Sequence, residues 1–245
     1  MPSWIEQAAH RGILTTRFPR TPATEEEVPA SARAPVAPDL ESLGRARDAC
    51  PVGAITEWTV DQGRCIRCAR CLPAGLAFRG PVDASTRSRA ALVTGETLPS
   101  SAGEPPVLPG FRRSLHLFLV DVGSCNACNL EVLAIANPFY DSQRLGIFFT
   151  NSPRHADVLL VVGVPTPEMR EPLRRAFEAI PAPKAVVAVG ACPISGGAFS
   201  GTPGLAGGLD ELLPVDVFVP GCPPPPVALL AALARIAGTP GRREA

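Results

Sequence analysis

The eight cysteines of this 245-residue chain constrain its fold more than any other feature, because they divide into two groups of four with different spacing. The first group lies in one short stretch, whereas the second extends from residue 125 to residue 222. The cysteines of the first group can meet within one loop. Those of the second group can meet at one site only if the fold brings distant turns together. The two groups are Cys50, Cys65, Cys68 and Cys71, and Cys125, Cys128, Cys192 and Cys222.

The first group has the spacing of one half of a two-cluster bacterial ferredoxin. Such ferredoxins repeat a CxxCxxCxxxCP run, and each cluster takes three thiolates from one run and its fourth from the other. In this chain, all four cysteines that would bind one cluster are replaced by other residues, and all four that would bind the other cluster are present. The absent positions carry Leu40, Leu43, Ala46 and Gly75. The pattern therefore predicts one [4Fe–4S] cluster at the first group.

Zinc and disulfide bonds are the alternatives for the first group. Four thiolates also suit tetrahedral zinc, although zinc sites more often pair two CxxC motifs than carry a CxxCxxC triplet. Disulfide bonds are typical of secreted chains, and the N-terminal sequence MPSWIEQAAHRGILTTRF has no apolar segment typical of a signal peptide. We therefore favour an iron–sulfur cluster and keep a zinc-stapled structural module as an alternative.

Five short apolar runs predict the fold of the second part of the chain. They are nearly continuous and rich in β-branched residues, which is typical of strands buried on both faces. After the third run, Thr166 would cap a helix that begins at Pro167, and an apolar helix is predicted over 226–238. Strands that alternate with helices indicate a parallel α/β sheet of flavodoxin-like type. The five runs are 114–123, 144–150, 156–163, 184–190 and 215–221.

Each cysteine of the second group follows the end of one of these runs. Cys125 and Cys128 follow the first run, Cys192 follows the fourth, and Cys222 follows the fifth. Ligands of open parallel sheets bind outside the carboxyl ends of the strands, and the neighbouring glycines would let the backbone approach closely. We therefore expect the second group to converge on that edge and hold a second [4Fe–4S] cluster. Four unrelated buried cysteines would not explain this placement.

Residues 110–240 resemble a known family in four motifs that occur in the family's order: GSCNACNLEV, SPRHADVLLVVG, KAVVAVGAC and PVDVFVPGCPPPPVALL. The family is the 20-kDa-type small subunit shared by respiratory complex I and the membrane-bound, energy-converting [NiFe] hydrogenases. The resemblance implies that the second group of cysteines holds one [4Fe–4S] cluster, the last before the catalytic large subunit. The N-terminal half is similar to the polyferredoxin-like subunit of those complexes, so two ordinarily separate chains are fused here.

The first motif separates the branches of this family. Complex I subunits carry two adjacent cysteines there, whereas the hydrogenase branch carries CxxC followed by an acidic residue, as in Cys125, Cys128 and Glu131. The sequence therefore resembles the small subunit of formate hydrogenlyase and related group 4 hydrogenases, although Ala127 and Asn129 depart from the usual residues. The match suggests that Glu131 relays protons near the catalytic partner. Alternatively, Glu131 is an ordinary carboxylate in the first turn of a helix.

The functional hypothesis is an iron–sulfur electron-transfer subunit of an oxidoreductase complex, with no catalytic centre in this chain alone. It predicts as partners a hydrogenase large subunit or its homologue, together with other iron–sulfur and membrane subunits. Two alternatives remain: the equivalent subunit of a complex I-like NADH–quinone or hydrogenase-related oxidoreductase that lacks nickel, and the zinc-stapled module. Through its complex, the chain is expected in the cytoplasm at the inner face of the cell membrane.

Charge and hydropathy argue against other classes of protein. The 23 basic and 23 acidic residues give a formal net charge of zero, which is not typical of a nucleic-acid-binding protein. No apolar run reaches the roughly 18 residues that a transmembrane helix requires. The expected organisation is an extended arm over 1–39, a small ferredoxin-like α+β domain over 40–79, a linker over 80–110 and the flavodoxin-like domain over 111–240.

Overall fold

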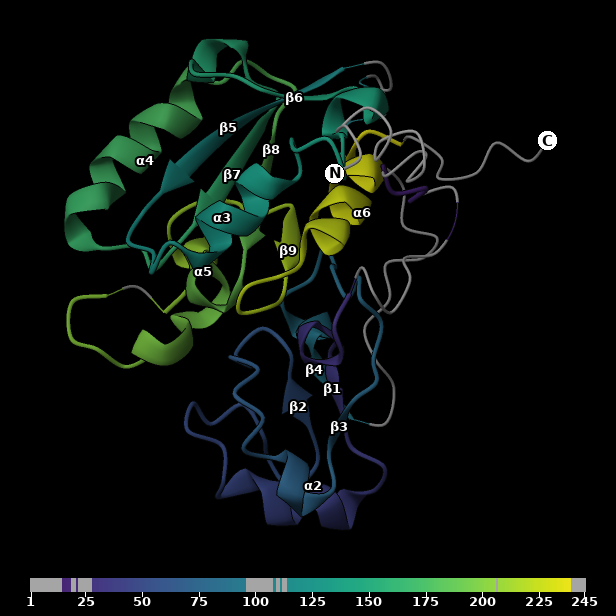
Figure 1. Cartoon of the computed structure of the whole chain (residues 1–245). Helices are drawn as coiled ribbons and strands as arrows, with labels where there is room; N and C mark the ends of the chain where they lie inside the picture. Colours follow the sequence, from purple (N-terminus) through teal and green to yellow (C-terminus); the bar gives the residue numbers. More distant parts are fainter. Residues whose placement is uncertain are drawn as a thin grey trace, which may run out of the picture.

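A five-stranded parallel sheet forms the centre of the C-terminal domain in the computed structural model (Figure 1). The strand order is β6-β5-β7-β8-β9, and every residue of β7 and β8 is buried. Counted along this domain the order is 2-1-3-4-5, which is the flavodoxin-like order. The predicted fold is therefore confirmed, and each predicted run contains one strand. The strands are β5 (Leu115–Asp121), β6 (Ile147–Phe149), β7 (Val158–Val162), β8 (Ala185–Val189) and β9 (Val217–Val219).

The structure describes residues 15–18, 21, 28–95, 108, 111, 114–205 and 207–238. Much of the predicted arm, and residues 96–107 of the predicted linker, lie outside this range. Short 3₁₀ helices join the main elements of the described part. They are η1 (Ala30–Ala32), η2 (Leu72–Ala74), η3 (Ala90–Leu92), η4 (Ser142–Leu145), η5 (Pro153–His155), η6 (Gly197–Phe199) and η7 (Leu209–Glu211).

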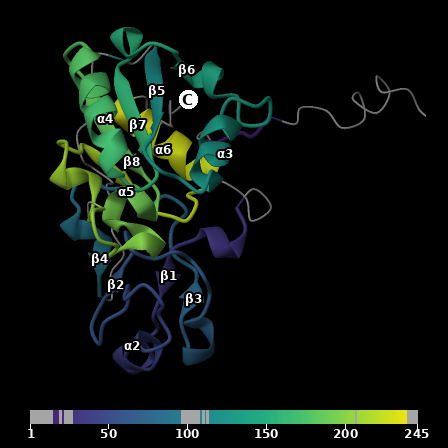
Figure 2. The same ribbon diagram turned by 90° about the vertical axis from the view of Figure 1, so that its left-hand side faces the viewer.

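Helices cover both faces of the sheet and bury two separate apolar clusters (Figures 1 and 2). On one face, α3 (Ala127–Ala134) and α6 (Pro226–Ile236) pack against the sheet. On the other face lie α4 (Pro167–Ala179) and α5 (Ala191–Ser195). Because both faces are covered, the strands must be apolar on both sides, which explains their continuous apolar sequence.

The two predicted helices of this domain are confirmed. Thr166 precedes α4 as its N-cap residue with extended backbone, and Pro167 is the first helical residue, where its missing N–H and restricted φ suit a helix start. Leu173 on α4 is buried, and Ile180 is buried just after the helix. The last helix, α6, is buried on nearly all sides, and Gly238 follows it with φ +68°.

The small N-terminal domain consists of one helix and two short antiparallel strand pairs (Figure 1). Strand β1 (Pro35–Val36) pairs with β3 (Ala77–Phe78), and β2 (Val60–Asp61) pairs with β4 (Val93–Thr94). Helix α2 (Leu40–Arg47) begins where the Asp39 carboxylate accepts a hydrogen bond from the Ser42 N–H at 2.7 Å. This cap satisfies one of the otherwise unpaired N–H groups of the first turn.

Positions that a two-cluster ferredoxin gives to cysteine serve as packing positions here. Leu43 and Ala46 of α2 are buried in the core of the small domain. Gly75 has φ +107°, and a β-carbon at this position would lie 2.9 Å from Ser42 Oγ. Leu40 is 43% exposed. An apolar helix face and a glycine that packs against it therefore occupy positions where a second ferredoxin cluster would need ligands.

The small domain is larger than the predicted range of 40–79. Strand β1 lies in the segment expected to be an arm, and β4 lies in the segment expected to be a linker. Residues 80–95 contact both domains: Thr86 pairs with Phe218 beside β9, Arg89 pairs with Asp61 at 2.6 Å, and the carboxylate of Asp83 pairs with Arg235. Composition predicted a linker because these residues are polar and proline-containing, but their contacts depend on residues far away in the sequence.

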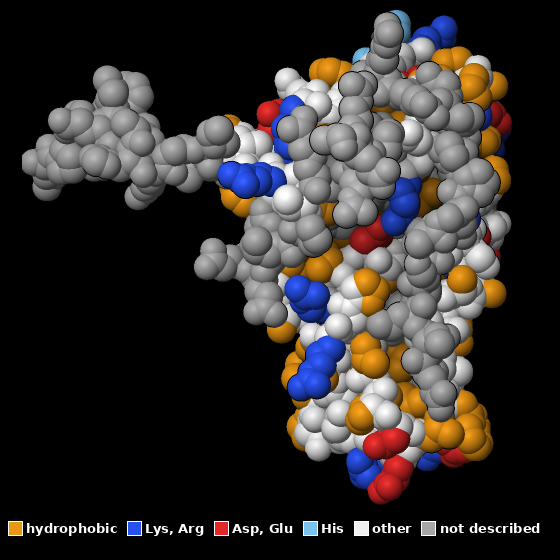
Figure 3. All heavy atoms as spheres, turned by 90° about the vertical axis from the view of Figure 1, so that its right-hand side faces the viewer, with side chains coloured by type: hydrophobic (Ala, Val, Ile, Leu, Met, Phe, Trp, Pro, Cys, Tyr) orange, Lys and Arg blue, Asp and Glu red, His pale blue; other side chains and the backbone are white. Residues whose placement is uncertain are grey.

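Basic and acidic side chains lie beside one another at several places on the face shown in Figure 3. At the lower end of the molecule, where α2 lies, Arg45 pairs with Glu41 and Arg47 pairs with Glu57. This mixture agrees with the balanced net charge of the sequence.

Within the described residues, no helix combines the length and the hydropathy that crossing a membrane requires.

Candidate metal centres

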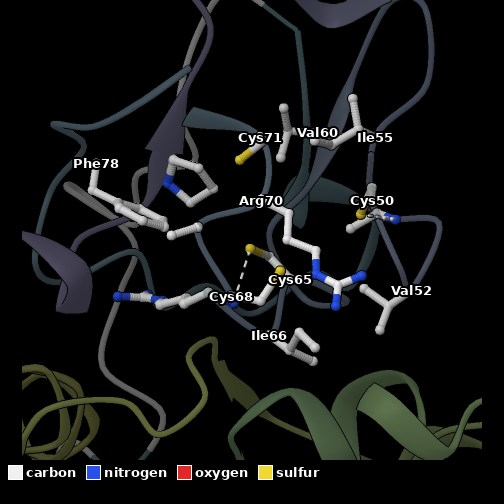
Figure 4. Close-up of a pocket in the computed structure, with 14 residues that line it drawn as sticks. Cys50, Val52, Ile55, Val60, Cys65, Ile66, Cys68, Arg70, Cys71 and Phe78 are labelled. Atoms are coloured by element: carbon white, nitrogen blue, oxygen red, sulfur yellow. Dashed lines mark hydrogen bonds between the residues drawn. The ribbon is translucent and has the colours of Figure 1, made fainter. Parts of the chain in front are cut away.

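The first cysteine quartet lines a pocket in the small domain (Figure 4). Cys50 follows α2, and Cys65, Cys68 and Cys71 lie on the loop between β2 and η2. Apolar side chains, including Ile55, and two arginines, Arg67 and Arg70, complete the lining. Figure 4 shows the four labelled cysteines around one space. The structure therefore brings together the four residues that the ferredoxin spacing selected.

Backbone N–H groups point at two sulfur atoms of this quartet. The Ala54 N–H donates to Cys50 Sγ at 3.2 Å, and the Arg67 N–H donates to Cys65 Sγ at 3.4 Å. The loop turns back on itself at Arg67 and Ala69, which have φ of +53° and +65°. Hydrogen bonds of this kind stabilise negative charge on sulfur and are one of the means by which a protein tunes an iron–sulfur cluster.

Burial raises the pKa of Cys65 to about 11, and the charges of Cys71 and Cys50 act in the same direction. Burial also raises the pKa of Cys71, with smaller contributions from Cys68 and Cys50. Four thiols this close resist joint ionisation, because each thiolate would repel the others. A bound metal centre reverses this balance, since coordination to a metal cation deprotonates a thiol.

The second quartet lies at the carboxyl edge of the sheet, as the sequence predicted. Cys125 lies in the turn after β5, and Cys128 lies in the first turn of α3. Cys192 lies in α5 directly after β8, and Cys222 follows β9. Burial raises the pKa of Cys128 to about 12, and Cys192, Cys222, Cys125 and Glu131 add to the increase. Residues from three separate turns are therefore electrostatic neighbours.

Between β8 and α5, residue 190 must be glycine, because the sulfur of Cys128 lies very close to its backbone. Gly190 has φ +95°, and a β-carbon there would lie 2.7 Å from Cys128 Sγ. Contacts below 3.0 Å essentially never occur for a real β-carbon. Burial raises the pKa of Cys192 to about 11 as well, with additional effects from Cys222 and Cys125. The backbone thus closes around the sulfurs and leaves no room for a side chain at residue 190.

Both quartets provide thiols alone, which is the donor set of a [4Fe–4S] cluster. In such a cluster the four thiolates bind four different iron atoms, whereas a zinc ion needs all four sulfurs at about 2.3 Å from one point. Among the residues that the structure describes, no group of three or more His, Cys, Asp or Glu side chains is arranged to hold a single metal ion. The type of donor and the N–H groups at the sulfurs fit the cluster that the sequence predicted.

Glu131 lies near the second quartet, on α3. It is not in the first helical turn, so the interpretation as an ordinary first-turn carboxylate is wrong. Burial raises the pKa of Glu131, and its charge contributes to the raised pKa of Cys128. Glu131 also lines a pocket together with Arg67 and Cys222. A half-buried carboxyl group beside a cysteine site is a candidate acid or base.

The departures at Ala127 and Asn129 have a structural explanation in part. Asn129 donates to the Asp121 carboxylate at 2.6 Å and to Ser124 Oγ at 2.9 Å, and thereby holds the turn before Cys125. Burial alone would raise the pKa of Asp121, but hydrogen bonds from Ser124, Gly123 and Asn129 outweigh it, and the pKa is lowered. Ala127 is the first residue of α3. Asp121 ends a strand and belongs to no motif, so nothing in the sequence marks it as part of this turn.

The two quartets lie near the boundary between the domains, where Arg67 Nη2, on the loop of the first quartet, donates to the Pro220 carbonyl, two residues before Cys222, at 3.3 Å. Burial raises the pKa of Cys222, Cys125 adds to the increase, Arg67 opposes it, and Cys68 of the first quartet adds again. The domain contact is direct, because Ser195 Oγ donates to the Gly63 carbonyl at 3.0 Å. Sequence analysis predicted two sites on one chain, and the structure makes them neighbours.

The chain joins a small ferredoxin-like domain to a flavodoxin-like domain, with one all-cysteine site in each. Residues 125–236 match the family described as NADH ubiquinone oxidoreductase, 20 Kd subunit. The chain belongs to this family, as the four motifs indicated.

Two curated relatives and two solved structures show the extent of the similarity. Formate hydrogenlyase subunit 7 of Escherichia coli is 44% identical over 132 residues, which cover 54% of this chain and 52% of the relative. The probable membrane-bound hydrogenase subunit mbhJ of Pyrococcus furiosus is 48% identical over 118 residues, which cover 48% of this chain and 71% of the relative. This chain therefore spans about half the length of the first relative.

Among solved structures, a chain of the membrane-bound sulfane sulfur reductase, an archaeal respiratory membrane complex, has a TM-score of 0.47 and 31% identity. The match covers 54% of this chain and 73% of that chain. A chain of an NAD⁺-reducing [NiFe]-hydrogenase has a TM-score of 0.36 and 21% identity over 46% of this chain and 85% of that chain.

Proposed function

We propose that this chain is the iron–sulfur electron-transfer subunit of a membrane-bound [NiFe] hydrogenase of the formate hydrogenlyase type. It would pass electrons to or from the catalytic large subunit through two [4Fe–4S] clusters, one in each domain. The observation that carries this proposal is one all-cysteine quartet in each domain, with the loop of the first joined by the Arg67–Pro220 hydrogen bond to the turn before Cys222. The names of the two curated relatives support the hydrogenase branch.

The residues of the chain have distinct tasks in this proposal. A [4Fe–4S] cluster supplies one-electron redox chemistry when it is bound. Cys50, Cys65, Cys68 and Cys71 would hold one cluster, and Cys125, Cys128, Cys192 and Cys222 the other. The N–H groups of Ala54 and Arg67 stabilise charge on sulfur in the first site. Cys71 and Cys128 are buried, whereas Cys68 and Cys125 are exposed. Each site is therefore partly open to water, and exposure to water is one determinant of cluster potential.

Glu131 is proposed to exchange protons with the catalytic partner. Its carboxyl group is half-buried, and burial raises its pKa, which moves it toward the range in which a carboxyl group both takes up and releases protons near neutral pH. The pocket that Glu131 shares with Cys222 places this group beside the second site. The partner would be the large subunit, with further iron–sulfur and membrane subunits in the complex, at the cytoplasmic face of the membrane.

A second candidate function is the equivalent subunit of a complex I-like oxidoreductase without nickel. The description of the matching family favours it, because that description names NADH–ubiquinone oxidoreductase. The two candidates differ in the large subunit and not in this chain. Purification of the intact complex, followed by nickel analysis and a hydrogen assay, distinguishes them: nickel with hydrogen evolution supports the hydrogenase, and their absence supports the alternative.

The cofactors are tested by anaerobic purification of the full chain with iron and acid-labile sulfide analysis. Two [4Fe–4S] clusters correspond to about eight iron and eight sulfide per chain. The Cys68→Ser variant is expected to lose one reduced-state EPR signal and keep the other, because Cys68 belongs to the first quartet alone. Zinc without labile sulfide would favour the structural module, and joint loss of both signals would contradict two separate sites.

A further inference from the structure

Arg67 spans the boundary between the two cysteine quartets. It lies on the loop between Cys65 and Cys68, and its backbone N–H donates to Cys65 Sγ at 3.4 Å. Its side chain reaches into the other domain, where Nη2 donates to the Pro220 carbonyl at 3.3 Å. Pro220 lies two residues before Cys222. One side chain therefore connects the loop of the first site to the turn that carries the second.

Arg67 also lines two pockets, one of which holds the whole first quartet, and the other only Cys222 of the second. The pocket with Cys222 also contains Glu131. The backbone of Arg67 has φ +53°, in the left-handed region that residues with a β-carbon rarely adopt. The loop adopts this conformation at the residue whose side chain leaves the small domain.

The guanidinium group of Arg67 is a buried charge whose hydrogen bonds are incomplete. In the described part of the chain, its Nη1 is the one buried side-chain nitrogen or oxygen without a hydrogen-bond partner. Burial lowers the pKa of Arg67, and the charges of Cys65 and Cys222 oppose that effect. Removing a cation from water is unfavourable unless negative charge compensates it. The nearby groups that can supply this charge are the cysteine sulfurs of both sites.

We propose that Arg67 is a shared counter-charge that raises the reduction potentials of both [4Fe–4S] clusters; this inference rests on the proposed function. A cluster with four thiolate ligands has a net negative charge, and reduction adds one electron and no proton. A fixed cation nearby stabilises the reduced form more than the oxidised form. Arginine remains protonated throughout, so an electron can move from one site to the other without proton transfer at this residue.

The test is an EPR-monitored redox titration of the anaerobically purified full chain. Arg67→Gln removes the charge and keeps hydrogen-bonding capacity, and it is expected to lower both midpoint potentials. The expected change is about tenfold in the ratio of reduced to oxidised cluster at a given potential, which corresponds to about 59 mV for one electron. Arg67→Lys keeps a positive charge and is expected to restore most of the change at both sites.

Arg70→Gln is the matched control, because Arg70 lies on the same loop, lines the first pocket and is exposed. It is expected to leave the potential of the second cluster unchanged. If Arg67→Gln leaves that potential unchanged, or changes it no more than Arg70→Gln does, Arg67 is not a shared counter-charge. A purely structural role for Arg67 would reduce cluster content without this paired change in potential.

Iron and sulfide are measured in the same samples, so that the two proposals fail in different ways. A wild-type chain without iron and sulfide contradicts the proposed function and, with it, the role of Arg67. Loaded clusters with unchanged potentials contradict the role of Arg67 alone. If Arg67→Gln does not retain its clusters, the Arg67→Lys variant decides. Midpoint potentials like those of the wild type at both sites support the counter-charge. Lower midpoint potentials at both sites, although the positive charge is kept, overturn it.

Discussion

Single glycine positions set how closely the backbone approaches the sulfurs of the second site. At Gly190 both the left-handed φ and the 2.7 Å approach to Cys128 Sγ exclude a β-carbon. The next nearest atoms are the Gly221 carbonyl oxygen at 3.4 Å and Pro224 Cδ at 3.8 Å, which lie on either side of Cys222. At this scale the site depends on the absence of side chains as much as on the presence of cysteines.

Gly190→Ala is therefore expected to prevent assembly of the second cluster. Iron content should fall from about eight to about four per chain, and the EPR signal of the first cluster should remain. Gly201→Ala is the control, because Gly201 also has a left-handed φ, +83°, but a β-carbon there would meet nothing within 4 Å. Equal loss of iron in both variants would show that backbone strain, and not the contact with Cys128, is responsible.

Glu131→Gln is expected to raise the thermal unfolding midpoint at neutral pH. Burial raises the folded-state pKa of Glu131 above its ordinary value of 4.5. The native state therefore binds more protons than the unfolded chain, and the wild-type protein loses stability as pH rises above 4.5. The glutamine variant avoids this loss, and its advantage should shrink as pH falls toward 4.5. The shift should not exceed the roughly 2–4 °C that 1 kcal/mol produces at this chain length.

Glu168→Gln provides the comparison for this pH series. Glu168 is exposed in the first turn of α4, where a carboxylate interacts favourably with the helix N-terminus. Its replacement should leave the midpoint unchanged or lower it. A Glu131→Gln midpoint at or below wild type at neutral pH would argue against the desolvated carboxylate.

At the scale of single elements, α6 and α3 differ in how much of their surface the sheet covers. Helix α6 is buried on nearly all sides between the sheet and its neighbours, whereas α3 buries one side and exposes Leu130 and Leu133. Both helices follow cysteine-bearing turns, so their packing fixes the direction in which these turns leave the sheet.

Leu230→Ala in α6 is expected to destabilise the protein by about 2–5 kcal/mol, because the side chain is fully buried and its removal leaves a cavity. Leu130→Ala in α3 should change stability by less than about 0.5 kcal/mol, because Leu130 is 62% exposed. Urea unfolding under anaerobic conditions measures both. Similar effects of the two substitutions would contradict the packing of α6.

At the scale of the whole molecule, residues 80–95 hold the two domains together. Thr86 continues the sheet beside β9 through backbone hydrogen bonds with Phe218 at 3.0 and 2.8 Å. Asp83 and Arg235 form an ion pair between this segment and α6. The relative position of the two cysteine sites depends on these contacts, since the loop of Arg67 meets the other domain nearby.

Two reduced clusters in neighbouring sites would interact magnetically, and Arg235→Gln is expected to weaken this interaction without loss of iron. The pair is partly exposed, so the effect on stability should be only about 1 kcal/mol, but a small increase in domain mobility changes the separation of the sites. Arg45→Gln is the control, because it removes an exposed ion pair within α2. An unchanged EPR interaction in the Arg235 variant would show that other contacts fix the domains.

The two quartets, the parallel sheet and the family could all be predicted from the amino-acid sequence. Local spacing identified Cys50, Cys65, Cys68 and Cys71, and continuous apolar runs identified the strands, because short-range pattern reflects short-range structure. Even the scattered quartet was predictable, since the carboxyl ends of parallel strands meet at one edge. The cluster assignments themselves remain predictions until iron and sulfide are measured.

The extent of the small domain, the surroundings of Glu131 and the position of Arg67 became visible only in the folded chain. Strands β1 and β4 have two residues each, too few for a periodic pattern, and their pairing partners lie far along the chain. Nothing in the sequence distinguishes Arg67 from Arg70, because both precede a cysteine on the same loop. Contact across a domain boundary separates them, and such contact depends on the packing of both domains, which local spacing does not encode.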